Sequence, residues 1–156
     1  MILTALVLLP GCFQLQRETI EEEAEHNNST ETFTHQARLG ERLFQDNCQK
    51  CHGQQGQGTE KGPRVIGLKA GALSLDPPAG AQKRNMKFRT VSDIAHFVIM
   101  KMPADEPGKL SADDYFRILA FDLRENGIDL GDQHLDMGVA AKTELPWRDG
   151  DAVSAR

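Results

Sequence analysis

The pentapeptide Cys48-Gln49-Lys50-Cys51-His52 constrains this chain more than any other feature of its sequence. It places two thiols three residues apart and an imidazole directly after the second thiol. On a tight turn these three side chains can act together on one bound group. The motif is compatible with a covalently attached haem, a structural zinc ion or a thiol redox pair.

The haem interpretation fits the spacing best. Two thiols on one turn can add to the two vinyl groups on one edge of the porphyrin, and the next residue then lies beneath the iron. A structural zinc needs four Cys or His ligands, and no second pair of ligands with suitable spacing occurs. A thioredoxin-like pair expects a strand before a helix, and no strand pattern is visible. The motif therefore predicts one covalent haem c, bound through Cys48 and Cys51, with His52 as an iron ligand.

The third cysteine stands in a different context. Residues 2–9 form an apolar run, too short to cross a membrane, that ends in Leu9-Pro10-Gly11-Cys12. This sequence resembles the cleavage box of bacterial lipoproteins, although Pro10 is unusual there and no Lys or Arg precedes the run. We expect 1–11 to be a signal segment and Cys12 to carry lipid, which would anchor the protein in the bacterial cell envelope, facing the periplasm or the exterior. The alternative is a stray cysteine after an apolar tail.

The remaining chain divides by composition. Residues 12–33 are acidic and polar, which is typical of a linker or membrane tether. Apolar residues at helical spacing predict helices over 34–47, 92–101 and from Ser111 to about 125, joined by a Gly- and Pro-rich stretch over 53–89 that would wrap a cofactor. We therefore expect an all-α domain at 34–128 and an acidic, loosely structured tail at 129–156.

The net charge of -5 is unevenly distributed. Residues 1–47 hold three Lys or Arg against eight Asp or Glu, 48–109 hold ten against five, and 110–156 hold five against ten. An acidic chain of this kind is a poor binder of nucleic acid. The basic middle could steer an acidic protein partner.

Residues 35–128 resemble the class I, mono-haem c-type cytochrome family. A helix with Gly40 and Phe44 runs into the Cys48–His52 motif, and Ile118-Leu119-Ala120-Phe121 lies in a C-terminal helix. The resemblance implies a small all-α fold with crossed N- and C-terminal helices, in which Gly40 allows close approach and Phe44 meets Phe121. Long loops would surround the haem.

The resemblance also implies partners for the iron and its histidine. Gly62-Pro63 stands where the family presents a carbonyl to the ligating histidine, so the Pro63 carbonyl is expected to accept from His52. Met102-Pro103 is the family's sixth-ligand position, and Pro103 would end the preceding helix there. Met100 and Met86 remain alternative ligands, and Met137 lies beyond the last expected helix.

Two further features bear on the site. Asp122 stands where relatives often carry a leucine directed toward the haem, and Leu119–Gly131 also looks weakly like the haem domains of quinoprotein alcohol dehydrogenases. The histidines outside the motif are expected to be ordinary surface or linker residues. The candidate partners of the haem propionates are Arg64, Lys83, Arg84, Asn85 and Arg89.

We expect an electron carrier that is not itself an enzyme, because His/Met ligation leaves no iron position for a substrate. Its partners would be redox proteins with acidic docking surfaces in a respiratory or photosynthetic chain. One alternative is a permanently docked haem subunit of a larger membrane redox complex or quinoprotein dehydrogenase. Another is an open-site haem sensor or peroxidase, which would require that Met102 does not bind the iron.

Overall fold

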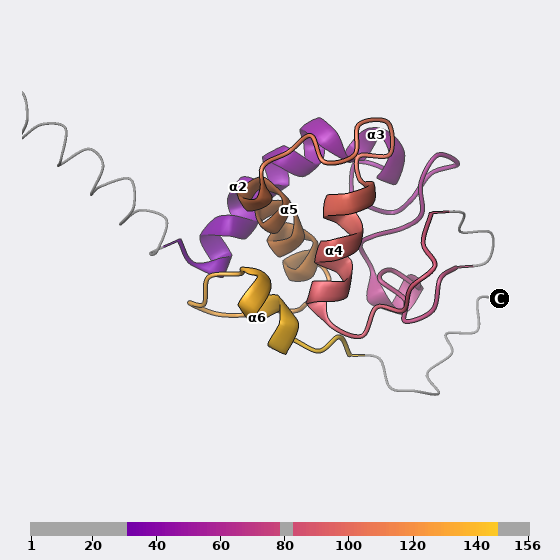
Figure 1. The fold of residues 1–156 in the computed structure, drawn as a ribbon. Helices are drawn as coiled ribbons and strands as arrows, with labels where there is room; N and C mark the ends of the chain where they lie inside the picture. Colours follow the sequence, from indigo (N-terminus) through magenta and orange to yellow (C-terminus); the bar gives the residue numbers. More distant parts are fainter. Residues whose placement is uncertain (1–30, 79–82, 147–156) are drawn as a thin grey trace, which may run out of the picture. The chain divides into compact units, whose positions relative to one another are not determined.

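A computed structural model describes residues 31–78 and 83–146 (Figure 1). The elements are α2 (Phe33–Asn47), α3 (Gln49–His52), the 3-10 turn η1 (Leu68–Ala70), α4 (Val91–Lys101), α5 (Ala112–Glu125) and α6 (Met137–Lys142). Within these two ranges the only β pairing is an isolated bridge between Thr90 and Glu144. The all-α prediction is confirmed. None of the helices in the described ranges is long and apolar enough to cross a bilayer.

Helix α2 begins at Phe33, one residue before the predicted start at Thr34. The side chain of Thr32 accepts a hydrogen bond from the amide of His35, which satisfies one of the free donors of the first turn. The compact unit that contains the helices also begins at Thr32. The domain thus starts inside the stretch 12–33 that composition assigned to the linker.

Helices α2 and α5 cross at a glycine, as the family resemblance implied. A Cβ atom on Gly40 would lie 1.8 Å from the carbonyl oxygen of Arg117, so only glycine permits this approach. One turn further along, the rings of Phe44 and Phe121 pack with centroids 5.3 Å apart. The crossing fixes the end of α2, and the Cys48–His52 motif follows directly from it.

Side chains near the end of α5 hold the first loop in place. Gly127 follows the helix with a positive φ of 79°, a conformation that glycine adopts easily and that commonly ends helices. The amide of Asn126 donates to the Val65 carbonyl and its oxygen accepts from the Gly67 amide, both at 2.8–2.9 Å. One side chain therefore ties the loop after the motif to the C-terminal helix.

The segment after α5 corrects the expectation of a loose tail at 129–156, as far as residue 146. Leu135 and Ala140 are fully buried in the main core, and Leu145 is nearly so. The buried amide of Gln36 donates to the carbonyl and accepts from the amide of Leu135. The acidic side chains of this segment stay at its surface while a few apolar anchors bury. Residues 147–156 lie outside the described ranges.

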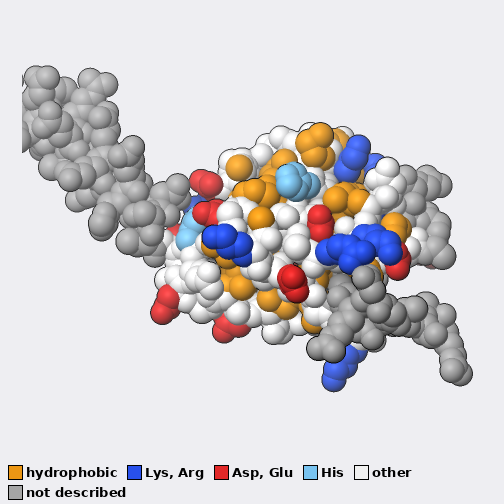
Figure 2. Space-filling model, turned by 60° about the horizontal axis from the view of Figure 1, so that its bottom comes forward, with side chains coloured by type: hydrophobic (Ala, Val, Ile, Leu, Met, Phe, Trp, Pro, Cys, Tyr) orange, Lys and Arg blue, Asp and Glu red, His pale blue; other side chains and the backbone are white. Residues whose placement is uncertain are grey.

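Charged side chains of both signs are scattered over the face shown in Figure 2, among hydrophobic and other side chains. The basic residues on this face are interspersed with acidic ones rather than collected into one patch.

Candidate haem site

The motif residues occupy one turn at the end of α2. Cys48 is both the last cap of α2 and the first cap of α3. Its carbonyl accepts from the amides of Cys51 and His52 at 3.1 and 3.0 Å. Both thiols are free and half-buried, and they share one side of the turn, since residues three apart on a helical turn are neighbours.

The environment of Cys48 argues against a thiol redox pair. Burial, followed by the nearby Asp122 and Cys51, raises the pKa of the Cys48 thiol to about 12. Redox-active cysteines in Cys-X-X-Cys motifs instead have lowered pKa values, because the thiolate is the reacting species. The described residues also contain no cluster of three or more His, Cys, Asp or Glu side chains that could hold a metal ion by themselves.

The imidazole of His52 is oriented by the loop that follows it. Its Nδ1 lies 2.7 Å from the carbonyl oxygen of Pro63, in the contact that the resemblance implied. Thr59 supports the loop by donating to the Cys51 carbonyl at 2.5 Å. With the proton on Nδ1, the lone pair of Nε2 is available to an iron atom.

Gly62 lets the loop lie directly against the motif. A Cβ at this position would come within 2.9 Å of the Cys51 carbonyl oxygen and 3.2 Å of Cε1 of the His52 ring. The Gly62-Pro63 pair thus combines a close backbone approach with a rigid turn that presents a carbonyl.

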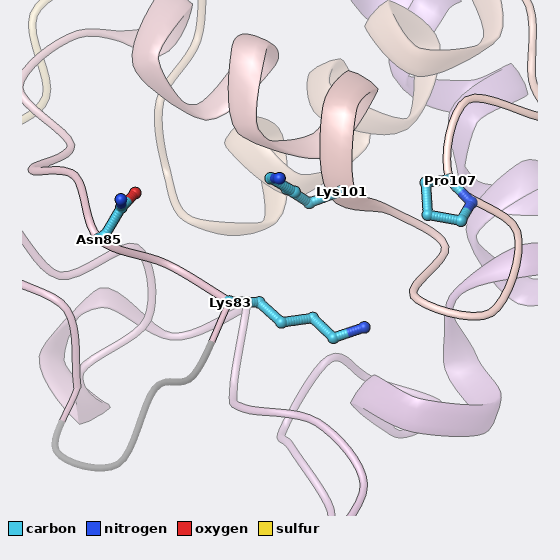
Figure 3. A pocket seen from close by; sticks show the side chains of 4 residues that line it. All are labelled: Lys83, Asn85, Lys101 and Pro107. Atoms are coloured by element: carbon cyan, nitrogen blue, oxygen red, sulfur yellow. The ribbon is translucent and has the colours of Figure 1, made fainter.

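A cavity of about 410 Å³ opens between the end of α4 and the loop segment at 83–85. Figure 3 shows Lys83, Asn85, Lys101 and Pro107 around it, and the Lys83 side chain extends across the view toward the 104–107 loop, where it donates to the Ala104 carbonyl. Of the five candidate propionate partners, Lys83 and Asn85 line this cavity.

Two of the other candidates are engaged elsewhere. Arg84 is buried, donates to the carbonyls of Ser74, Leu75 and Met86, and places its guanidinium 3.6 Å from the centre of the Phe88 ring. Arg64 donates to the Ile66 carbonyl. Arg84 therefore closes the base of the loop that leaves at Leu75 and returns at Met86.

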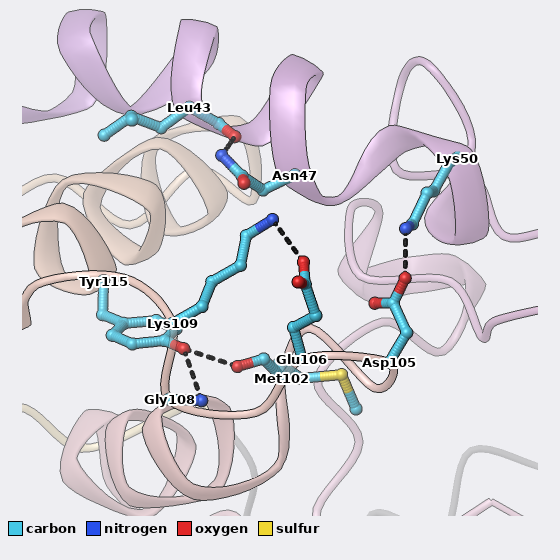
Figure 4. Close-up of polar contacts among 9 residues, drawn as sticks. All are labelled: Leu43, Asn47, Lys50, Met102, Asp105, Glu106, Gly108, Lys109 and Tyr115. Carbon is cyan, nitrogen blue, oxygen red and sulfur yellow. Dashed lines mark hydrogen bonds and ion pairs between the residues drawn. The ribbon is translucent and has the colours of Figure 1, made fainter.

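Met102 lies where α4 ends, with extended backbone that turns the chain away from the helix axis. The Tyr115 hydroxyl donates to the Met102 carbonyl at 2.5 Å and accepts from the Gly108 amide at 3.1 Å. Figure 4 shows the Met102 side chain directed away from Tyr115, on the side where Asp105 and Lys50 lie. Sequence patterns did not predict this anchor, although Tyr115 is the single tyrosine of the chain.

The other methionines are placed less favourably as ligands. Met100 projects from α4 with 65% of its surface exposed. Met86 and Met137 pack against the main hydrophobic core. Among the other histidines, His96 bonds to Ser92 within its own helix. His26 and the proposed lipidation site Cys12 lie outside the described ranges.

The residues present fit a covalently bound haem. Two free, half-buried thiols share a turn, one imidazole is held with its Nε2 available, and a methionine stands at a helix end, next in sequence to Lys101, which lines a cavity. The all-α fold and this donor set together define a class I, mono-haem c-type cytochrome.

The comparisons with known proteins place the chain more narrowly. Residues 35–121, more than half of the chain, match the family model described as cytochrome c oxidase, cbb3-type, subunit III, and the chain belongs to this c-type cytochrome family. The family implies haem c and a role in electron transfer.

A solved structure gives an independent match to the fold. The sulfane dehydrogenase SoxCD from Paracoccus pantotrophus aligns with a TM-score of 0.52 and 23% identity, over 92% of this chain and 68% of that chain. A comparison with curated proteins gave no match.

Proposed function

We propose that this protein is a membrane-tethered cytochrome with a single covalent haem that passes one electron at a time between redox proteins. The haem would be attached at Cys48 and Cys51, with His52 and Met102 as its axial ligands. The observation that carries the proposal is the His52–Pro63 hydrogen bond, because it leaves Nε2 of the histidine available on the turn that carries both thiols.

The residues favour electron transfer over catalysis at the iron. A bound haem supplies a one-electron couple, and His/Met ligation raises its reduction potential. Tyr115 fixes the backbone of Met102 and so favours a filled sixth position over an open one. With both axial positions filled by protein side chains, the chain's task is to hold the group, exclude water and present an edge to partners.

Replacement of Met102 tests this proposal directly. The Met102→Ala variant should still contain covalent haem that resists acid–acetone extraction, but it should bind CO and have a lower potential. Met100→Ala, which removes an exposed methionine two residues away, is the matched control and should retain the parent spectrum. Haem that washes out of the parent protein, or CO binding by the parent protein, would contradict the proposal.

The membrane tether rests on the sequence Leu9-Pro10-Gly11-Cys12. A single acyl chain anchors a protein only marginally, so stable attachment requires more than one chain on the mature cysteine. Mass spectrometry of the mature N-terminus should find a lipidated Cys12, and Cys12→Ser should release the cytochrome into the soluble fraction. An unmodified Cys12 in a membrane-bound protein would require another anchor.

A permanently docked subunit is the second candidate, because the matching family model is described as a subunit of an oxidase. In that arrangement the partner would remain bound after extraction. Mild detergent extraction should then yield a stable complex in which residues 13–30, which precede the folded domain, resist protease. A tethered shuttle should instead be isolated alone, with those residues cleaved readily.

A further inference from the structure

Asp122 is an exception within the hydrophobic interior. It lies on α5, is buried, and is surrounded on its own helix by buried apolar residues. Its Oδ1 atom has no hydrogen-bond partner among the described residues. A buried carboxylate without a partner is costly, and proteins commonly avoid that cost by keeping the group protonated.

The carboxyl group lies beside the first attachment cysteine. Cys48 packs against the cluster formed by Phe44, Ile118 and Phe121, and Asp122 follows Phe121 and stands one turn after Ile118. Asp122 is also the strongest charged influence on the Cys48 thiol. The carboxyl group therefore lies in the same buried region as the thiol that would attach the haem.

No neighbouring positive charge among the described residues offsets the negative charge of an ionised Asp122. Burial is the main cause that raises its pKa well above the usual range, and Glu125 on the same helix acts in the same direction. From the α2–α3 turn the neighbouring titratable group is Cys48, with Cys51 acting on that thiol, and Lys109 also acts on Cys48 from the loop before α5. The loop after the motif packs only the uncharged side chains of Val65 and Ile66 against the cluster of Phe44, Ile118 and Phe121. Thioether formation would abolish the titration of Cys48 and leave burial and Glu125 acting on the carboxyl.

We propose that Asp122 is a proton-binding site coupled to electron uptake by the haem, an inference that rests on the proposed function. When the haem accepts one electron from its donor, it loses one positive charge, and the Asp122 carboxylate takes one proton from water to become a carboxylic acid. Oxidation reverses both steps, so the electron leaves to the acceptor and the proton returns to solvent.

The direction of the pH dependence follows from this balance. The haem's positive charge stabilises the carboxylate, so the pKa of Asp122 is lower in the oxidised protein than in the reduced protein. Between these two pKa values reduction takes up a proton, and the midpoint potential falls by about 59 mV for each tenfold decrease in proton concentration. This region lies above the pH range in which an exposed aspartate titrates.

Spectroelectrochemical titration of the full holoprotein across pH tests the proposal. The midpoint potential of the parent protein should fall with rising pH over part of the range. Asp122→Asn should abolish this fall while keeping nearly the same side-chain shape. Asp113→Asn, at an exposed position on the same helix, is the matched control and should leave the pH dependence unchanged. Asp122→Leu removes the carboxyl group and fills its buried site with an apolar side chain, and it replaces Asp122→Asn if the latter does not fold.

The outcomes separate this inference from the proposed function. A flat potential in the parent protein, or a falling region that survives in both Asp122 variants, would overturn the inference and assign any pH dependence to other groups such as the propionates. A reversible one-electron couple in those same samples would leave the proposed function intact. Absence of covalent haem or of a reversible couple would defeat the proposed function itself.

Discussion

Main-chain atoms make the decisive contacts at both proposed ligands. The His52 ring is oriented by a carbonyl, and the Met102 segment is held through its carbonyl by the Tyr115 hydroxyl. Such contacts survive most side-chain changes in the loops, so the loops can vary while the ligands keep their positions. A substitution can remove such a contact only where a side chain supplies the partner, as the Tyr115 hydroxyl does for the Met102 carbonyl.

Replacing Tyr115 by Phe should loosen the Met102 loop. The ring remains buried, but the hydroxyl's bonds to the Met102 carbonyl and the Gly108 amide are lost. We expect a loss of about 1–2 kcal/mol in unfolding free energy, since two main-chain groups lose a partner. We also expect faster binding of CO by the reduced protein, measured by stopped flow.

Thr143→Val is the matched control for this prediction. It removes a single side-chain hydrogen bond, from the Thr143 hydroxyl to the Val139 carbonyl on α6, away from the Met102 loop. It should lower stability by a similar order without opening the iron to CO. Equal CO binding in both variants would mean that the tyrosine acts on general stability alone.

The motif could be identified from the sequence because its chemistry is local. Cys48, Cys51 and His52 lie on one turn, so their spacing determines their geometry. The role of Tyr115 could not be predicted, because its partners belong to a loop whose path is set by the packing of α4 against α5. The candidate partners of the propionates could not be narrowed from the sequence for the same reason. The tertiary fold decides which of these side chains line the cavity.

At the scale of elements, the crossing of α2 and α5 carries the site. Gly40→Ala would place a methyl group into the Arg117 carbonyl, where both groups belong to rigid helices. The helices must then separate, at a cost of about 3 kcal/mol. Chemical denaturation of the holoprotein should measure this loss, and the yield of mature haem protein should fall with it.

Gly138→Ala in α6 is the control for the same glycine-to-alanine change. The new methyl group would meet only the Asp136 side chain, at 3.3 Å. Alanine also favours a helix over glycine by up to about 1 kcal/mol, so the net change should stay within that range. A loss in Gly138→Ala as large as in Gly40→Ala would contradict the assignment of the α2–α5 contact as the critical one.

Helical periodicity was sufficient for α2, α4 and α5, because each buries a regular apolar stripe. It was insufficient for α6, which has only six residues. The segment around α6 is held by anchors that lie far apart in sequence, including the Gln36–Leu135 amide bonds and the Leu145 bond to the Arg89 carbonyl. Tertiary hydrogen bonds of this kind leave no periodic pattern.

At the scale of the whole molecule, the basic middle segment is partly neutralised by its own acidic neighbours. Lys50 pairs with Asp105 and Lys109 with Glu106, and Figure 4 shows both pairs beside the Met102 loop. Exposed pairs of this kind contribute little to stability. Their effect is on the field that a partner meets, because they reduce the positive charge near the proposed haem edge.

The proposed acidic partner surface can be tested through this field. Lys101, which lines the cavity at the end of α4, is directly exposed to an approaching partner. Lys101→Glu should slow second-order electron transfer with the physiological partner at low ionic strength, and the difference from the parent should diminish as salt is added. Asp105→Asn should act oppositely and speed the reaction, because it leaves the charge of Lys50 uncompensated.

Lys142→Glu makes the same charge change on α6, which Figure 1 places well away from α3 and the end of α4. If local steering operates, this control should alter the rate much less than Lys101→Glu, although both variants have the same net charge. Equal slowing in the two variants would show that only total charge matters. A rate that ignores both salt and Lys101→Glu would argue against steering and in favour of a docked subunit, because electrons that move within a preformed complex do not depend on an encounter.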